Sequence, residues 1–224
     1  MVTLGNPGPA PFAIFGSRIV VGRSLYDFRS ATPTVPILGL SQVPPPLALN
    51  GSEFGSSVAM SGTHVVVGDR FAGSGTLYVY NQGSATPVVV LRSPSPRFGE
   101  YFGRAVAVSG NFVVVGNNLE FEGGDSGPGA ARVYVFDLSR ADPTIPVLTL
   151  SNPNFDGAFE SDRFGTAVAI SDKRVVVGAY SEREGGKSGS AYFYDLGGLN
   201  PAVPVATLTR PDPSTNYYFG SSVA

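Results

Sequence analysis

The chain repeats one short pattern along most of its length. Phe54–Arg70 reads FGSSVAMSGTHVVVGDR, Phe102–Asn118 reads FGRAVAVSGNFVVVGNN, and Phe164–Tyr180 reads FGTAVAISDKRVVVGAY. A degenerate copy occupies Pro11–Arg23, and Phe219–Ala224 begins another. Each full copy has two runs of small and β-branched residues around a few turn residues. This predicts two short buried strands joined by a tight turn.

Two further strands are expected in every repeat. The glycines that close the VVVG runs (IVVG in the first copy) lie 46, 48 and 62 residues apart, at Gly22, Gly68, Gly116 and Gly178. This period is typical of four-stranded propeller blades. The third strand is aromatic, at 24–28, 77–80, 133–136 and 191–194, and the fourth follows a proline, at 36–40, 87–91, 146–150 and 204–208. Because proline has no backbone donor, we expect the fourth strand at the outer edge of its sheet.

The sequence therefore predicts an all-β propeller of four-stranded antiparallel blades. We expect one domain over residues 1–224, with blades at 11–50, 54–97, 102–157 and 164–212 and partial strands at 1–7 and 219–224. The first strand should be innermost, and the aromatic third strand should fill the space between blades. A β-sandwich is the alternative architecture, but sandwich strands do not usually repeat with a four-strand period. The partial strands could complete a blade, belong to a larger ring in a longer protein, or combine between two chains.

Composition excludes several functions. The net charge of −2 gives no electrostatic reason to expect binding to nucleic acid or to an anionic membrane. Without cysteine there are no disulfides, thiolate metal sites or cysteine nucleophiles. No apolar run approaches the roughly 18 residues that span a bilayer, so we expect no membrane insertion. The first residues lack the basic and apolar regions of a signal peptide.

The repeated pattern resembles the FG-GAP repeats of integrin α-subunit-like β-propellers. Four FG pairs carry the resemblance, beginning at Phe54, Phe102, Phe164 and Phe219, and Gly178-Ala179-Tyr180 best matches the GAP position. The resemblance implies a propeller at the cell surface or outside the cell, in adhesion or protein binding.

Many members of that family bind calcium between the first two strands of a blade. Calcium needs six to eight oxygen ligands, which requires several carboxylates in one loop. The corresponding turns here are Ser61-Gly62-Thr63, Ser109-Gly110-Asn111 and Ser171-Asp172-Lys173. They lack the acids and the length, so we expect no metal site and no cofactor.

We expect function on the face formed by the loops between strands 2 and 3 and between one blade's strand 4 and the next blade's strand 1. These loops are irregular and polar, and binding residues concentrate in loops on rigid scaffolds. The candidate ligand-binding residues are Asp69, Arg70, Glu120, Glu122, Asp125, Glu182, Arg183, Glu184, Tyr217 and Tyr218. Solvation and surface ion pairing are the alternative interpretation of the charged loops, and blade packing that of the aromatic residues. The single histidine, His64, is expected to be structural or exposed.

No arrangement of a nucleophile with an orienting base is apparent. The leading hypothesis is a non-enzymatic module that binds protein or glycan. One alternative is a structural subunit that self-associates through its incomplete terminal blades. Another is a glycoside-cleaving enzyme, which would need two of Glu120, Glu122, Glu182 and Glu184 about 5–9 Å apart in one pocket.

Overall fold

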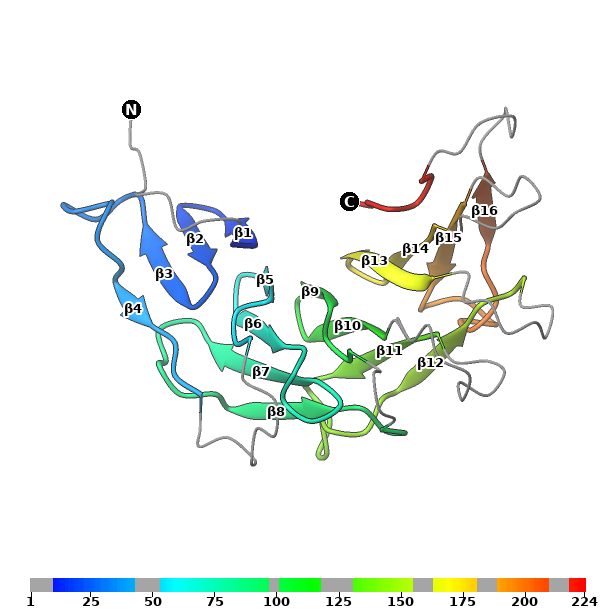
Figure 1. Cartoon of the computed structure of the whole chain (residues 1–224), viewed down its shortest axis with the longest axis horizontal. Helices are drawn as coiled ribbons and strands as arrows, with labels where there is room; N and C mark the ends of the chain where they lie inside the picture. Colours follow the sequence, from blue (N-terminus) through cyan, green and yellow to red (C-terminus); the bar gives the residue numbers. More distant parts are fainter. Residues whose placement is uncertain are drawn as a thin grey trace.

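The computed structural model describes residues 10–42, 53–96, 101–117, 131–154, 163–180, 189–209 and 218–224. Within them lie four four-stranded sheets, and in each sheet the strands follow one another in chain order (Figure 1). All strand pairs are antiparallel. We call the sheets blades 1 to 4. The predicted all-β fold of four-stranded antiparallel blades is confirmed.

The strands of each blade are as follows. Blade 1 contains β1 (Phe12–Phe15), β2 (Arg18–Val21), β3 (Ser24–Asp27) and β4 (Leu38–Gly39). Blade 2 contains β5 (Ser57–Met60), β6 (His64–Asp69), β7 (Thr76–Asn81) and β8 (Val89–Arg92). Blade 3 contains β9 (Ala105–Ser109), β10 (Phe112–Asn117), β11 (Arg132–Asp137) and β12 (Leu148–Ser151). Blade 4 contains β13 (Phe164–Ser171), β14 (Arg174–Ala179), β15 (Ser190–Asp195) and β16 (Ala206–Thr209).

The fourth strands are outermost, as the prolines predicted, but they begin two residues later than expected. In blade 2 the strand starts at Val89 rather than at Pro87. The first hydrogen bond to the third strand is donated by the Val88 amide to the Val79 carbonyl, at 2.7 Å. Proline itself cannot donate such a bond, so regular pairing develops only after it.

The blades stand side by side in an arc with their first strands nearest its centre (Figure 1). β1 contacts β5, β5 contacts β9, and β9 contacts β13. Small side chains such as Ala59, Ala107 and Ala169 occupy these first strands, which lets neighbouring blades converge. The predicted order of strands within a blade is therefore confirmed.

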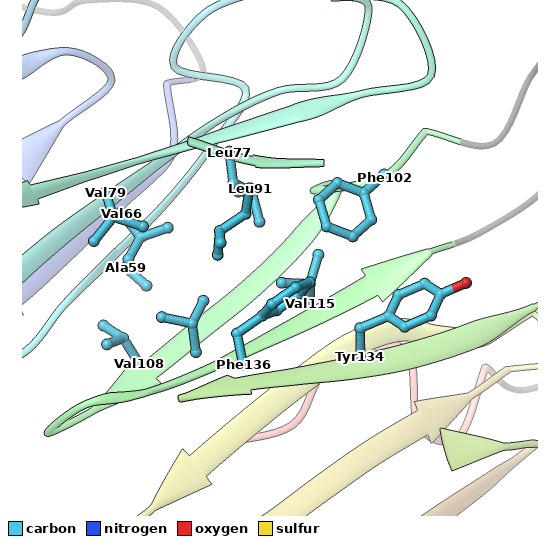
Figure 2. Close-up of a cluster of buried hydrophobic side chains, with 11 residues drawn as sticks. Ala59, Val66, Leu77, Val79, Leu91, Phe102, Val108, Val115, Tyr134 and Phe136 are labelled. Atoms are coloured by element: carbon cyan, nitrogen blue, oxygen red, sulfur yellow. The ribbon is translucent and has the colours of Figure 1, made fainter. Parts of the chain in front are cut away.

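Hydrophobic side chains fill each interface between consecutive blades. Figure 2 shows the interface between blades 2 and 3, where Ala59, Val66 and Leu77 face Tyr134 and Phe136. The third strands bury their aromatic side chains almost completely. The side chains that are at most 2 % exposed are Tyr78, Tyr80, Tyr134, Phe136, Tyr192 and Tyr194. Burying one such side chain stabilises the fold by about 1.5–3 kcal/mol. The third strand thus occupies the space predicted for it.

The two faces of a blade differ in character. The face toward the preceding blade carries aromatic and larger side chains, including Tyr78 and Tyr80 in blade 2 and Tyr192 and Tyr194 in blade 4. The face toward the following blade carries smaller aliphatic side chains, such as Val114, Val133 and Leu150 in blade 3. Each interface therefore joins an aromatic face to an aliphatic face.

Two repeated glycines bring the main chains of neighbouring blades into direct contact. A Cβ added to Gly116 of the VVVG run would overlap the carbonyl oxygen of Gly165 in the next FG pair and lie 3.0 Å from its carbonyl carbon. In the preceding interface, a Cβ on Gly68 would lie 2.7 Å from the carbonyl oxygen of Gly103. The VVVG glycine of one repeat thus makes room for the FG glycine of the next.

The FG glycine is needed for a second reason. Gly55, Gly103, Gly165 and Gly220 all have φ between 83° and 94°, a region that side chains with a Cβ disfavour. The buried phenylalanines beside two of them, Phe102 and Phe164, are fully covered. The FG pair is therefore a turn that directs a ring into the blade interface while its glycine contacts the preceding blade.

The C-terminal copy makes the same contact. A Cβ on Gly178 would overlap the carbonyl oxygen of Gly220. Residues 218–224 form a turn and a bend rather than a strand. The predicted partial strand at 1–7 lies outside the described residues.

Candidate ligand-binding face

Turns between first and second strands lie on one side of the blades, and the 2–3 and 4–1 loops lie on the other, because strand direction alternates in a meander. The FG pair and the VVVG run fix two positions at the edge of this second side. One is the residue before FG, occupied by Glu53, Tyr101, Arg163 and Tyr218. The other is the second residue after the VVVG glycine, occupied by Arg70 and Tyr180 in blades 2 and 4.

In blade 2 these two positions form an ion pair. The Arg70 Nε lies 2.5 Å from Glu53 Oε2, and the guanidinium carbon lies 4.8 Å from the centre of the Phe71 ring. Phe71 also packs edge-on against Tyr101 of the next repeat, with 5.7 Å between ring centres. The predicted candidate Arg70 is thus partly exposed and fixed by a carboxylate and a ring.

In blade 4 the arginine occupies the position before FG instead of the position after the VVVG glycine. Arg163, before FG, donates a 2.7 Å hydrogen bond to the Tyr180 hydroxyl, and its guanidinium carbon lies 5.2 Å from the Tyr180 ring centre. Tyr180 packs edge-on against Tyr218, at 5.7 Å. The candidate Tyr218 is 55 % exposed, so this row of groups ends at an accessible ring.

Arg104 belongs to the repeat between these two pairs. It directly follows the FG pair of blade 3, where the other repeats have the hydroxyl residues Ser56, Thr166 and Ser221. Burial lowers the pKa of the Arg104 guanidinium. The charges of Arg70 and Arg163 lower this pKa further, while Tyr180 and Tyr101 act in the opposite direction. Arginine still remains protonated at neutral pH. Arg70, Arg104 and Arg163 belong to three consecutive repeats.

Asp69, another predicted candidate, is fully buried at the end of β6. Its carboxylate accepts hydrogen bonds from Gln42 Nε2 at 2.7 Å, from the Glu53 amide at 2.9 Å and from the Phe71 amide at 3.3 Å. It therefore connects the loop before blade 2 to the loop after β6. We assign Asp69 to this structural connection rather than to ligand contact.

The remaining candidates lie outside the described residues. They are Glu120, Glu122, Asp125, Glu182, Arg183, Glu184 and Tyr217. The carboxylate pair that a glycosidase would require falls among them.

His64 lies on the opposite side, among the turns between first and second strands. Its Nδ1 lies 2.8 Å from Thr63 Oγ1 and 3.2 Å from the Gly110 carbonyl oxygen. The second contact reaches the corresponding turn of blade 3. These contacts give His64 a structural position between blades.

Sequence reasoning missed Glu53, Phe71, Tyr101, Arg104, Arg163 and Tyr180. Aligning the repeats supplies a signal for some of them, since the residue before FG varies while the FG pair is constant, and the residue two after the VVVG glycine varies while that glycine is constant. Arg104 is a charged residue where the other repeats have a hydroxyl.

The described part of the chain holds no group of three or more His, Cys, Asp or Glu residues arranged as a metal site. Nor does any helix among these residues have the length and apolarity needed to cross a membrane. This edge presents guanidinium groups that lie beside aromatic rings.

A family model described as FG-GAP repeat matches residues 93–136 and 156–194. The chain therefore contains FG-GAP repeats in these two segments. The two matched segments include the FG pair, the VVVG run and the aromatic third strand of blades 3 and 4. The resemblance that the sequence suggested is confirmed. The FG-GAP propeller fold is that of a binding or scaffold module, generally without enzymatic activity.

Solved structures similar to the chain include a Dos1 propeller and Raptor. A Dos1 propeller is 14% identical, with 90% of this chain and 47% of that chain covered and a TM-score of 0.49. Raptor of Chaetomium thermophilum is 12% identical, with 88% of this chain and 16% of that chain covered and a TM-score of 0.52. The chain thus spans less than half of either structure, and the likeness concerns the fold alone. No curated protein matches.

Proposed function

We propose that this FG-GAP protein is a non-enzymatic module that recognises a protein or glycan outside the cell or at its surface, through the face of the 2–3 and 4–1 loops. The observation that supports this most directly is the row of charged and aromatic side chains at that face. Arg70, Phe71, Arg163 and Tyr180 are all partly exposed and lie at the ends of rigid strands. Side chains held in this way bind with a low entropic cost of ordering.

Substitutions on the two opposite faces test this proposal. A panel of glycans and extracellular proteins is screened by surface plasmon resonance with the wild-type chain. Every ligand found is then measured with Phe71→Ala and Tyr180→Ala, and with Ile145→Ala as the control, because Ile145 is 61% exposed in a 3–4 loop. Binding should fall in the first two variants and persist in the control. Ligands lost only in the control would place the binding function on the other face.

A second candidate function is self-association through the two ends of the arc. Phe12, Ile14 and Phe28 of blade 1 are 42–65% exposed on the aromatic type of face. Leu208 of blade 4 is 56% exposed on the outermost strand at the other end. Each internal interface joins an aromatic face to an aliphatic face. The aliphatic face of blade 4 in one copy would therefore pack on the aromatic face of blade 1 in another.

Light scattering over a range of concentrations tests self-association. The wild-type chain should form oligomers, and Phe12→Asp should shift it toward monomer with little change in unfolding midpoint, because Phe12 is exposed in the single chain. A wild-type chain that stays monomeric at all concentrations would remove this second function.

A further inference from the structure

Residues 219–224 cover part of the blade 4 face that points away from blade 3. A Cβ added to Gly178 would overlap the carbonyl oxygen of Gly220. The same relation joins Gly116 to Gly165 where blade 3 meets blade 4. Figure 1 shows the segment running toward the inside of the arc. It therefore lies where the FG pair of a following blade lies at an internal interface.

A second main-chain contact repeats in the same way. A Cβ on Gly189 would overlap the carbonyl oxygen of Phe219, and a Cβ on Gly75 would overlap that of Phe102. Each of these two glycines directly precedes the third strand of its blade. The segment also reads FGSSVA, a sequence identical to that of residues 54–59, which lead into β5. It thus has both the contacts and the residues that begin a blade.

Burial distinguishes the segment from its counterpart in blade 2. Ser57 and Ala59 are 6% and 7% exposed within a four-stranded sheet. The corresponding residues Ser222 and Ala224 are exposed and belong to none of the described strands. Segments with few buried contacts and no strand pairing open at the lowest cost in free energy. We therefore expect residues 219–224 to detach from blade 4 more readily than any strand of that blade.

Docking of a second copy requires the place that this segment occupies. First strands of consecutive blades contact each other, since β5 contacts β9 and β9 contacts β13. If blade 1 of a second copy packs on blade 4 in this geometry, its β1 lies beside β13. The residues that follow Gly220 already lie there, because the FG pair leads into the first strand in the internal blades. The incoming β1 must therefore displace them.

We propose that residues 219–224 are an autoinhibitory segment, which covers the blade 4 surface that receives β1 of a second copy. This inference rests on the second candidate function, self-association through the ends of the arc, and adds its regulation. A site that is open in only a fraction of molecules binds its partner more weakly by that fraction. Loosening the segment should therefore strengthen association.

Gly220→Val tests the inference because it changes the segment and leaves the surface of blade 4 intact. Gly220 has a φ of 86°, which a side chain with a Cβ disfavours, and the added Cβ would overlap the carbonyl oxygen of Ser190. The matched control is Gly83→Val, since Gly83 has a φ of 92° and no atom within 4 Å of an added Cβ. Hydrogen exchange should become faster in residues 219–224 of Gly220→Val and stay unchanged in β13.

Sedimentation velocity over a range of concentrations measures association. Gly220→Val should associate at a concentration about tenfold lower than the wild type, because main-chain overlap removes much of the stability of the closed segment. Gly83→Val should associate as the wild type does. Adding Phe12→Asp to Gly220→Val should abolish this gain, because Phe12 is 65% exposed on the blade 1 face that docks.

Three results would overturn the inference. Equal association of Gly220→Val and the wild type would show that the segment blocks nothing, and weaker association would make the segment part of the joint between copies. A gain that persists with Phe12→Asp would show that the released segment associates by another route. In the first two cases the wild type still associates, so the second candidate function stands. Absence of oligomers in both chains would contradict the inference and that function together.

Discussion

Replacing Gly116 by alanine should weaken the interface between blades 3 and 4. Gly116 lies within β10 and has no unusual φ, so alanine costs nothing in backbone conformation there. The added Cβ would overlap the Gly165 carbonyl, which is main chain and cannot rotate away. Overpacking of this kind costs about 1–3 kcal/mol. We expect about 3 kcal/mol, because moving Gly165 also displaces the fully buried Phe164.

The matched control is Gly39→Ala. Gly39 also lies in a strand, is exposed, and has no atom within 4 Å of an added Cβ. Removing a glycine at such a site stabilises by up to about 1 kcal/mol through the unfolded chain.

Urea unfolding followed by far-UV circular dichroism measures the difference between the two variants. With a denaturant slope of about 3 kcal/mol/M, Gly116→Ala should unfold about 1 M earlier than the wild type, and Gly39→Ala at the same concentration or later. Midpoints that agree within about 0.2 M would show that the glycine contact does not hold these blades together.

Three further predictions concern individual contacts. Gly178→Ala should release residues 218–224, seen as faster hydrogen exchange there, with a smaller loss of midpoint than Gly116→Ala; unchanged exchange would contradict the contact with Gly220. Tyr134→Phe removes the 3.0 Å hydrogen bond between the Tyr134 hydroxyl and Ser95 Oγ and should cost about 0.5–1.5 kcal/mol in the same urea assay; an unchanged midpoint would show that the bond contributes nothing. Hydrogen bonds from Thr144 hold the pKa of the Asp142 carboxyl below its usual range, so its stabilisation is present above the unfolded-state pKa and is lost as pH falls through the folded-state pKa. An NMR titration of Asp142 with a midpoint at or above 3.8 would contradict this.

The repeat allowed most of the fold to be predicted. Four aligned copies located the strands, and prolines identified the outer ones. The sequence could not show that Gly116 and Gly165 touch, because either glycine alone is explained by a turn or by small size. The contact becomes evident only when consecutive blades are placed beside one another.

The candidate binding face was harder to predict. Loop character led to the candidates Arg70, Tyr218 and Asp69 alike. Arg70 and Tyr218 stay predictions, whereas the Asp69 carboxylate accepts three hydrogen bonds in the interior. Polar character does not distinguish an acid that binds a ligand from one that organises two loops. Arg163 and Tyr180 were missed because one precedes β13 and the other follows β14. Their side chains come together only when these two strands pair.

The glycine contact has a consequence for how such chains evolve. Main-chain atoms form it, so its geometry is the same whatever side chains the surrounding loops acquire. A duplicated repeat would dock correctly from the outset, and its loops could then drift without disturbing the join. Charge at one blade and hydroxyl groups at its neighbours, as at Arg104 and Ser56, are the kind of divergence that such a join permits.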